Sequence, residues 1–117
     1  MTHADMSAAV RPDVQAAPMD LLSELSRDVA AFVTDVIPQS VRSPALKCAK
    51  EAREFADEPS LEEAADVLTC LLGWLHLAGH EVIDLLAASH SKMAVNLART
   101  WEKQSDGTWQ HIEPSTR

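Results

Sequence analysis

Apolar residues recur at three- and four-residue intervals through most of the chain after residue 18, a spacing typical of amphipathic helices. The first predicted helix begins near Met19 and ends before Pro38, since proline cannot continue a helix. The second opens at Ser43 and Pro44, with serine as the N-cap and proline at the first helical position. Each of these helices has one apolar face suited to packing against another element.

Two further helices are predicted in the second half of the chain. One begins after Ser60 and stops at Gly79, because glycine commonly ends a helix. The other runs from about Glu81 to Trp101 or Lys103. Beyond it, residues 106–107 mark a turn, and residues 108–112 are expected to form a short extended segment that folds back.

The predicted architecture is all-α, a four-helix bundle completed by oligomerisation. The chain has 117 residues, which favours one domain with a modest core. The helix after Ser60 is apolar nearly all round beyond Asp66, as expected at the centre of a bundle or beneath a second subunit. We therefore expect a homodimer or homotetramer, with residues 19–117 as the single domain and residues 1–18 as a flexible tail.

Four carboxylates stand at helical spacing on either side of the break between the second and third helices. Glu51 and Glu54 are three residues apart on one helix, and Glu63 and Asp66 are three residues apart on the next. Residues at this spacing share a helical face, so the two pairs face each other if the helices form a hairpin. Such a group of oxygen ligands suits Mg²⁺ or Mn²⁺. These four residues are the candidate metal ligands and catalytic residues.

Ordinary solvated helices carry the same spacing. Glu51 and Glu54 each have a lysine four residues before them, and each lysine is a potential ion-pair partner. Glu63 follows Ser60 by three residues, the spacing at which a glutamate caps the start of its own helix. Spacing alone therefore leaves a metal site and a charged surface open as alternatives.

A second candidate set lies on the last predicted helix, where Lys92, Asn96 and Arg99 share one face. Arginine is a forked donor, lysine a point charge and asparagine a neutral donor, so this face suits phosphate oxygens. Basic residues near the end of a helix also complement its dipole without binding a ligand. The pattern alone does not decide between these roles.

The formal net charge of −8 argues against binding to a nucleic-acid backbone, which needs clustered lysine and arginine. An anionic small substrate is compatible with this charge if divalent cations reverse the local field. Cys48 and Cys70 show no zinc-binding spacing, which indicates a reduced, cytoplasmic compartment. No apolar run reaches the roughly 18 residues of a membrane span, and no signal peptide is recognised.

These motifs resemble those of the MazG-like all-α nucleoside triphosphate pyrophosphohydrolases, whose metal signature is Glu-x-x-Glu followed by Glu-x-x-Asp. Residues 47–55 are similar to the second helix of that family, residues 61–68 to the third and residues 92–101 to the closing helix. Residues 106–112 resemble a phage branch, the dATP/dGTP diphosphohydrolases, which includes MazZ-type enzymes of phages that replace adenine with 2-aminoadenine. The resemblance covers about residues 20–112.

The resemblance implies metal-dependent cleavage of a deoxynucleoside triphosphate between its α- and β-phosphates, giving the monophosphate and pyrophosphate, in phage nucleotide-pool remodelling in the host cytoplasm. About two or three Mg²⁺ or Mn²⁺ ions would take part, and one carboxylate would accept a proton from the attacking water. The implied metal ligands are Glu51, Glu54, Glu63 and Asp66. The implied contacts to phosphate or sugar are Lys92, Asn96 and Arg99. Similarity to the phage branch, rather than any base-binding motif, makes dGTP the first expected substrate and dATP the second.

Two other functions stay open on the sequence. A pyrimidine-directed member of the same family would act on dUTP or dCTP. A non-catalytic acidic helical dimer would serve as an interaction module or a nucleic-acid mimic. Turnover of a panel of deoxynucleotides separates these possibilities.

Overall fold

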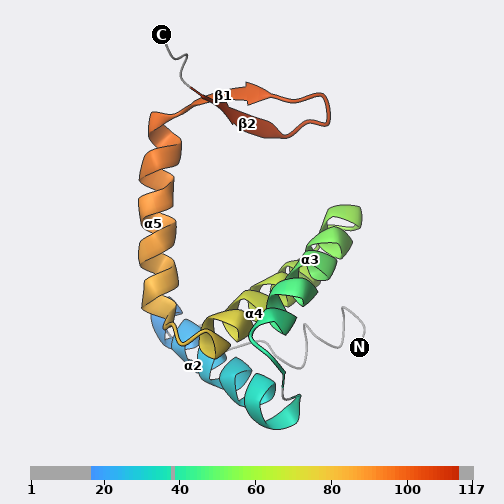
Figure 1. Cartoon of the computed structure of the whole chain (residues 1–117), viewed down its shortest axis with the longest axis vertical. Helices are drawn as coiled ribbons and strands as arrows, with labels where there is room; N and C mark the ends of the chain where they lie inside the picture. Colours follow the sequence, from blue (N-terminus) through green and yellow to red (C-terminus); the bar gives the residue numbers. More distant parts are fainter. Residues whose placement is uncertain (1–16, 38, 114–117) are drawn as a thin grey trace. The chain divides into compact units, whose positions relative to one another are not determined.

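The structure is a computed structural model that describes residues 17–37 and 39–113 (Figure 1). Residues 1–16, most of the predicted tail, lie outside the described part of the chain. The chain divides between Val82 and Ile83 into two units, which are described separately below. The first unit is built from helices, and the second from a helix followed by a two-stranded sheet.

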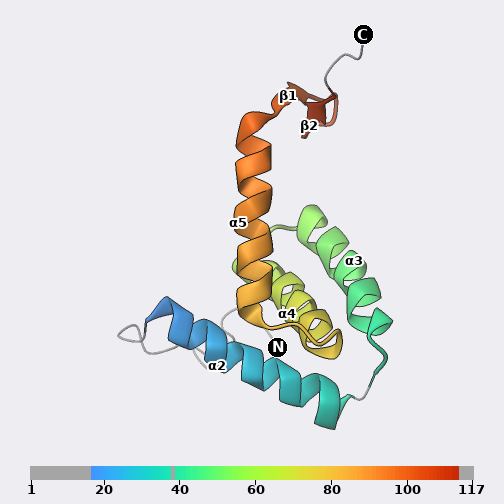
Figure 2. The same cartoon turned by 60° about the vertical axis from the view of Figure 1, so that its left-hand side comes forward.

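Two helices of the first unit form a hairpin, α3 (Arg42–Asp57) and α4 (Leu61–Leu77), and lie side by side in opposite directions (Figure 2). Alanine is frequent on α3, and such short side chains let α4 pack closely against it. The hairpin brings the two halves of the acidic signature onto neighbouring helices, as the sequence predicted.

Both ends of α4 lie where local sequence signals place them. Ser60 has an extended backbone, and its Oγ accepts a hydrogen bond of 3.0 Å from the backbone N–H of Glu63. At the other end Gly79 has a φ of +83°, in the left-handed region that terminates helices. The predictions for this helix are confirmed.

The predicted start of α3 is wrong by two residues. The helix begins at Arg42, with Val41 rather than Ser43 in the N-cap position. Ser43 already lies in the first turn, where its backbone N–H donates to the carbonyl of Ser40 at 3.1 Å. Pro44 is accommodated because the N–H groups of the first helical turn have no intrahelical partner.

The first predicted helix is confirmed as α2 (Pro18–Ala31), which continues into a turn of π-helix, η1 (Phe32–Val36). In this turn the backbone N–H of Ile37 donates to the carbonyl of Phe32, five residues earlier, at 3.0 Å. Helix α2 packs against α4 in the first unit. The buried apolar residues of the described chain lie on α2, η1 and α4; they are Val29, Val33, Leu72 and Leu75.

Gly73 permits the close approach of these elements. A Cβ atom built at this position would lie 3.2 Å from Cγ1 of Val33 and 3.7 Å from Cβ of Pro44. The missing side chain therefore brings α4 close to both η1 and the first turn of α3.

In the second unit, α5 (Val82–Ala98) precedes two antiparallel strands, β1 (Thr100–Lys103) and β2 (Trp109–Ile112). The turn between the strands contains Gly107 at a φ of +91°. Asp106 Oδ1 accepts hydrogen bonds from the backbone N–H and the hydroxyl of Thr108, at 2.9 and 2.6 Å. These bonds lower the pKa of Asp106, chiefly through the hydroxyl of Thr108.

The predicted end of the fourth helix is wrong. The helix stops at Ala98, and Trp101 and Lys103 belong to β1. The strand is held by pairing with β2 and by a hydrogen bond of 2.8 Å from Trp101 Nε1–H to the carbonyl of Asn96. The predicted extended segment at residues 108–112 is confirmed as β2. Over residues 17–37 and 39–113 the fold is therefore mostly helical with four main helices, as predicted, and carries one β-hairpin in addition.

Large apolar side chains remain exposed on the described helices. Leu61 on α4 is 90% exposed, and α5 buries none of its residues. Such exposure agrees with the expected oligomer, which stays a prediction. Among the described residues no single helix is long and apolar enough to cross a membrane; α4 and α5 qualify only when taken together across the break between them.

The N-cap of α4 yields a stability prediction. Replacing Ser60 by alanine removes the acceptor of the Glu63 N–H bond and should lower the free energy of unfolding by about 1 kcal/mol. Urea unfolding followed by circular dichroism measures the change. Ser60→Asn, which retains an acceptor at the cap, is the matched control and should stay close to wild type. An equal loss in both variants would contradict a capping role.

Candidate metal centre

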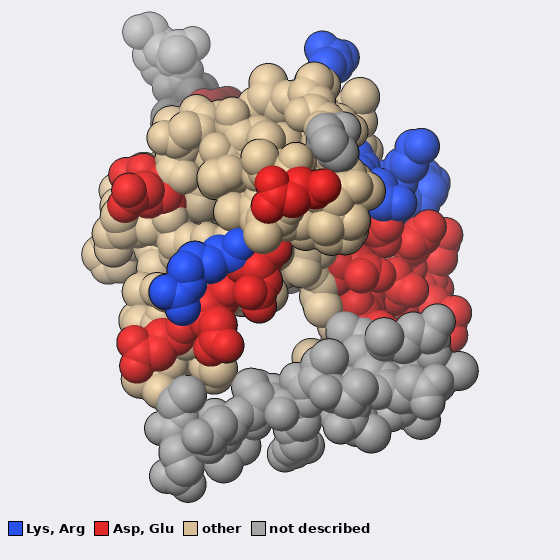
Figure 3. All heavy atoms as spheres, turned by 90° about the horizontal axis from the view of Figure 1, so that it is seen from below, with Lys and Arg blue, Asp and Glu red and all other residues tan. Residues whose placement is uncertain are grey.

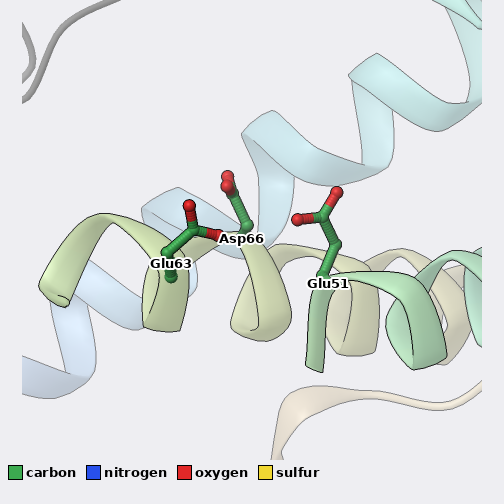
Figure 4. Close-up of side chains that lie close together, drawn as sticks. All are labelled: Glu51, Glu63 and Asp66. Carbon is green, nitrogen blue, oxygen red and sulfur yellow. The ribbon is translucent and has the colours of Figure 1, made fainter. Parts of the chain in front are cut away.

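Three carboxylates from two helices converge in the first unit. Glu51 lies on α3, and Glu63 and Asp66 lie on α4 (Figure 4). One oxygen from each residue lies within 4.8 Å of an oxygen of the others. The close-up shows the three side chains pointing into the same space between the helices. The hairpin thus brings together three of the four predicted ligands.

Glu51 is the most deeply buried member of the group, with 7% of its surface exposed. Its Oε1 forms an ion pair of 3.1 Å with Lys47, one turn earlier on α3. Its Oε2 is buried and has no hydrogen-bond partner among the described residues. Both alternatives left by the sequence thus hold in part: the lysine pair forms, and one oxygen remains for another ligand.

Glu63 offers a second buried oxygen without a partner, its Oε2. The Ser60 side chain caps the backbone of Glu63, as described above. No return bond from the Glu63 side chain to the N–H of Ser60 is present within the described residues, so the reciprocal capping box is not formed. The backbone N–H of Glu63 therefore takes part in capping α4, but the Glu63 carboxylate does not.

The pKa values of Glu54 and Asp66 are both raised beside these carboxylates. The pKa of Glu54 is raised, first by a hydrogen bond with Glu51 and then by the negative charge of that residue. Burial raises the pKa of Asp66, and the charges of Glu51 and Glu62 raise it further. Glu54 is exposed and lies outside the group of three. The negative charges of Glu51 and Glu63 nevertheless contribute to its raised pKa, so Glu54 lies at the edge of this carboxylate group.

This donor set fits a hard divalent cation. Buried polar atoms nearly always have partners, so the two buried carboxylate oxygens without a protein partner suit a positively charged ligand. Mg²⁺ and Mn²⁺ prefer carboxylate oxygen, and a cation would relieve the repulsion that raises the neighbouring pKa values. The described cluster contains no histidine or cysteine, which zinc would favour.

A pocket of about 450 Å³ adjoins two of these carboxylates. Glu51 and Asp66 line one part of it, and the wall continues along α4 through Cys70 to Gly73. Burial raises the pKa of the Cys70 thiol, so the thiol adds no charge to this wall. The opposite side comes from α2 and η1.

Sequence reasoning missed the α2 side of this pocket. Asp28 and Phe32 line it, and they stand four residues apart on one helical face. The available signal was an acidic residue one turn before an aromatic residue. From the sequence alone, that pair indicates only the surface of an amphipathic helix; the pocket forms when the α3–α4 hairpin packs beside α2.

The three predicted phosphate-binding residues all lie in the second unit. Lys92 and Asn96 lie on α5, and Arg99 lies in the bend between α5 and β1. The expected common helical face therefore holds for Lys92 and Asn96 but not for Arg99, because the helix ends at Ala98. The backbone N–H of Arg99 donates to the carbonyl of Asn96 at 3.3 Å. Phosphate binding by these residues stays a prediction.

Acidic side chains are more prominent than basic ones on one face of the molecule (Figure 3). Acidic side chains cover more of the face shown in Figure 3 than basic side chains do, in agreement with the net charge of −8. A phosphate group approaching such a surface is repelled unless cations reverse the local field. The charge distribution and the buried carboxylate oxygens without a partner therefore both favour binding of a cation.

No family model matches the chain. It is 32% identical over 94 residues to a dATP/dGTP diphosphohydrolase of Salmonella phage PMBT28; the match covers 78% of this chain and spans 31% of that longer relative. It is 30% identical over 100 residues to a dATP/dGTP diphosphohydrolase of Cyanophage S-2L, covering 80% of this chain and 90% of the relative.

The fold matches a solved structure as well. The MazG-like pyrophosphohydrolase of Cyanophage S-2L, bound to dGDP and three catalytic Mn²⁺ ions per active site, superposes with a TM-score of 0.62 at 29% identity. The match covers 79% of this chain and 97% of the solved one. Sequence and fold agree with the acidic helical hairpin described above, and the chain belongs to the MazG-like family of phage dATP/dGTP diphosphohydrolases.

Proposed function

We propose that this protein is a metal-dependent pyrophosphohydrolase that cleaves a purine deoxynucleoside triphosphate between the α- and β-phosphates. The products are the deoxynucleoside monophosphate and pyrophosphate, and dGTP is the first substrate with dATP the second. The two phage relatives are both dATP/dGTP diphosphohydrolases, which supports a purine substrate. Remodelling of the nucleotide pool in the host cytoplasm is the corresponding cellular role.

One observation carries the proposal. Glu51, Glu63 and Asp66 place carboxylate oxygens within 4.8 Å of one another, and two of the residues keep a buried oxygen without a partner. A structural ion pair would leave no such oxygens. A binding module that merely mimics nucleic acid would expose its charges, whereas Glu51 is 7% exposed.

The chain's own residues have separate tasks in this reaction. Glu51, Glu63 and Asp66 hold divalent cations, and Glu54 at the border supplies the fourth carboxylate. One of these carboxylates accepts the proton that the attacking water loses. Bound Mg²⁺ or Mn²⁺, about two or three ions, neutralises phosphate charge and lowers the pKa of a coordinated water. The solved relative from Cyanophage S-2L carries three catalytic Mn²⁺ ions per active site, which supports this metal requirement.

Lys92, Asn96 and Arg99 are proposed to contact phosphate or sugar oxygens. Positive charge and hydrogen-bond donors aimed at the leaving pyrophosphate stabilise the charge that develops there. Arg99 stands in a bend rather than within α5, so its forked guanidinium is not constrained to the direction of a helical side chain. We also propose that the active form is a homodimer or homotetramer, in which the exposed apolar residues of α4 and α5 are covered.

A panel of purified deoxynucleoside triphosphates with Mn²⁺ or Mg²⁺ tests the activity. We expect pyrophosphate release from dGTP first and dATP second, with little from dUTP or dCTP. Faster turnover of a pyrimidine nucleotide would make the enzyme a pyrimidine-directed member of the family. The absence of turnover with every nucleotide and both metals would favour an interaction module.

Substitution of the carboxylates tests the site. Glu54→Ala and Asp66→Ala should each lower kcat/KM by at least about a hundredfold, since even residues that only support metal ligands cost ten- to a hundredfold. Circular dichroism should show unchanged helicity. Asp57→Asn removes a charge from α3 outside the carboxylate group and serves as the matched control. Retained activity in both alanine variants would exclude this site.

The raised pKa values give a pH dependence with a definite sign. Glu54 and Asp66 bind protons more tightly in the folded than in the unfolded chain, starting from ordinary values of 4.5 and 3.8. Without divalent cations, their ionisation therefore lowers stability as the pH rises through this range and above it. Mn²⁺ binds the ionised forms, so the rise in Tm that it causes should be large at neutral pH and shrink on acidification. Differential scanning fluorimetry with Mn²⁺ and with EDTA measures it; a pH-independent rise would contradict binding at these carboxylates.

A further inference from the structure

The pocket beside the carboxylates has the size and lining of a small-molecule site. Its volume of about 450 Å³ lies within the range of roughly 300–1,000 Å³ that ligand pockets occupy. Glu51 and Asp66 border it, so a ligand held by cations on these residues extends into it. All of its lining residues belong to the first unit.

Part of the pocket lining is apolar. Phe32, Val33 and Pro44 contribute to it, and Gly73 lets α4 pack closely against Val33 and Pro44, since a Cβ there would lie 3.2 Å from Cγ1 of Val33. Phe32 is about half exposed, with 49% of its surface accessible, so its ring is available for stacking. An apolar lining with an accessible aromatic ring suits a base better than a sugar or a phosphate.

Two polar groups on the side away from α4 offer acceptors. Asp28 lies on α2, one turn before Phe32, and within the described residues its carboxylate makes no hydrogen bond or ion pair. Gln39 also lines the pocket, and its amide nitrogen is already engaged with the carbonyl of Ile37 at 3.0 Å. What remains of Gln39 for a ligand is chiefly its carbonyl oxygen. This side therefore favours a ligand edge rich in donors.

Asp28 lies on α2, apart from the helical hairpin that carries the carboxylate group. It does not belong to the cluster of three that suits a metal. Its place in the pocket is thus better explained by contact with the uncharged part of a ligand.

We propose that this pocket holds the base of the nucleotide and that Asp28 selects guanine. Guanine presents its N1–H and its 2-amino group side by side, and the two oxygens of an ionised carboxylate accept both hydrogen bonds in a bidentate arrangement. Adenine presents a lone pair at N1, which a carboxylate repels. 2-Aminoadenine offers the amino group but keeps the N1 lone pair, so it gains one bond and suffers the same repulsion. The inference rests on the proposed function and names the residue behind its substrate preference.

The test compares wild type with Asp28→Asn, which keeps the size of the side chain and removes the second acceptor. We expect the ratio of kcat/KM for dGTP to that for dATP to fall by roughly tenfold to a hundredfold, since a site built to hydrogen-bond a substrate group discriminates strongly against its absence. In wild type, dITP, which lacks the 2-amino group, should react more slowly than dGTP. Asp20→Asn on the same helix, outside the pocket lining, is the control and should keep the wild-type ratio.

A binding measurement accompanies the kinetics. Calorimetric titration with dGMP and dAMP should show weaker dGMP binding in Asp28→Asn and no loss for dAMP. Equal losses for both bases, or an unchanged ratio, would overturn the assignment of Asp28 while leaving the proposed hydrolysis intact. If wild type cleaves none of the nucleotides and binds neither monophosphate, the proposed function and this inference both fall.

Discussion

The first unit is organised around a carboxylate that is largely withdrawn from water. Glu51 is 7% exposed, and burying an ionised group costs several kcal/mol unless opposite charge and hydrogen bonds compensate. Lys47 compensates one oxygen, but its side chain is 60% exposed and its contribution is correspondingly screened by solvent. The second oxygen has no partner within the described residues, and neither does one oxygen of Glu63. A cation held at this place would compensate the charge that the protein itself leaves unbalanced.

One face of α4 connects the acidic and apolar parts of the site. Asp66 is followed at helical spacing by Thr69, Cys70 and Gly73, and all four line the same pocket. Charge therefore lies at one end of this face, and space for an uncharged group at the other. A nucleotide likewise has a charged end, its phosphates, and an uncharged end, its flat base. The π-helical turn after α2 supplies the opposing wall, as π-helical turns frequently do at functional sites.

Local signals predicted well those features that local physics determines. The Ser60 cap, the Gly79 terminus and the break between α3 and α4 follow from residues within one turn of each feature. The burial of Glu51 did not follow from periodicity, because it lies off the apolar stripe of its helix and becomes enclosed only by α4. The end of α5 was missed because pairing between β1 and β2, a contact across several residues, overrode the helical pattern. Asp28 was missed for a related reason, since the pocket that it lines exists only after three helical segments have packed.

The ion pair between Lys47 and Glu51 has a further consequence for loading and release. A divalent ion held by Glu51 would compete with the ammonium group of Lys47, which already neutralises part of the carboxylate charge. The net affinity for the ion would then be lower than the number of carboxylates suggests. Without an ion, the lysine would remain the counter-ion of the buried carboxylate.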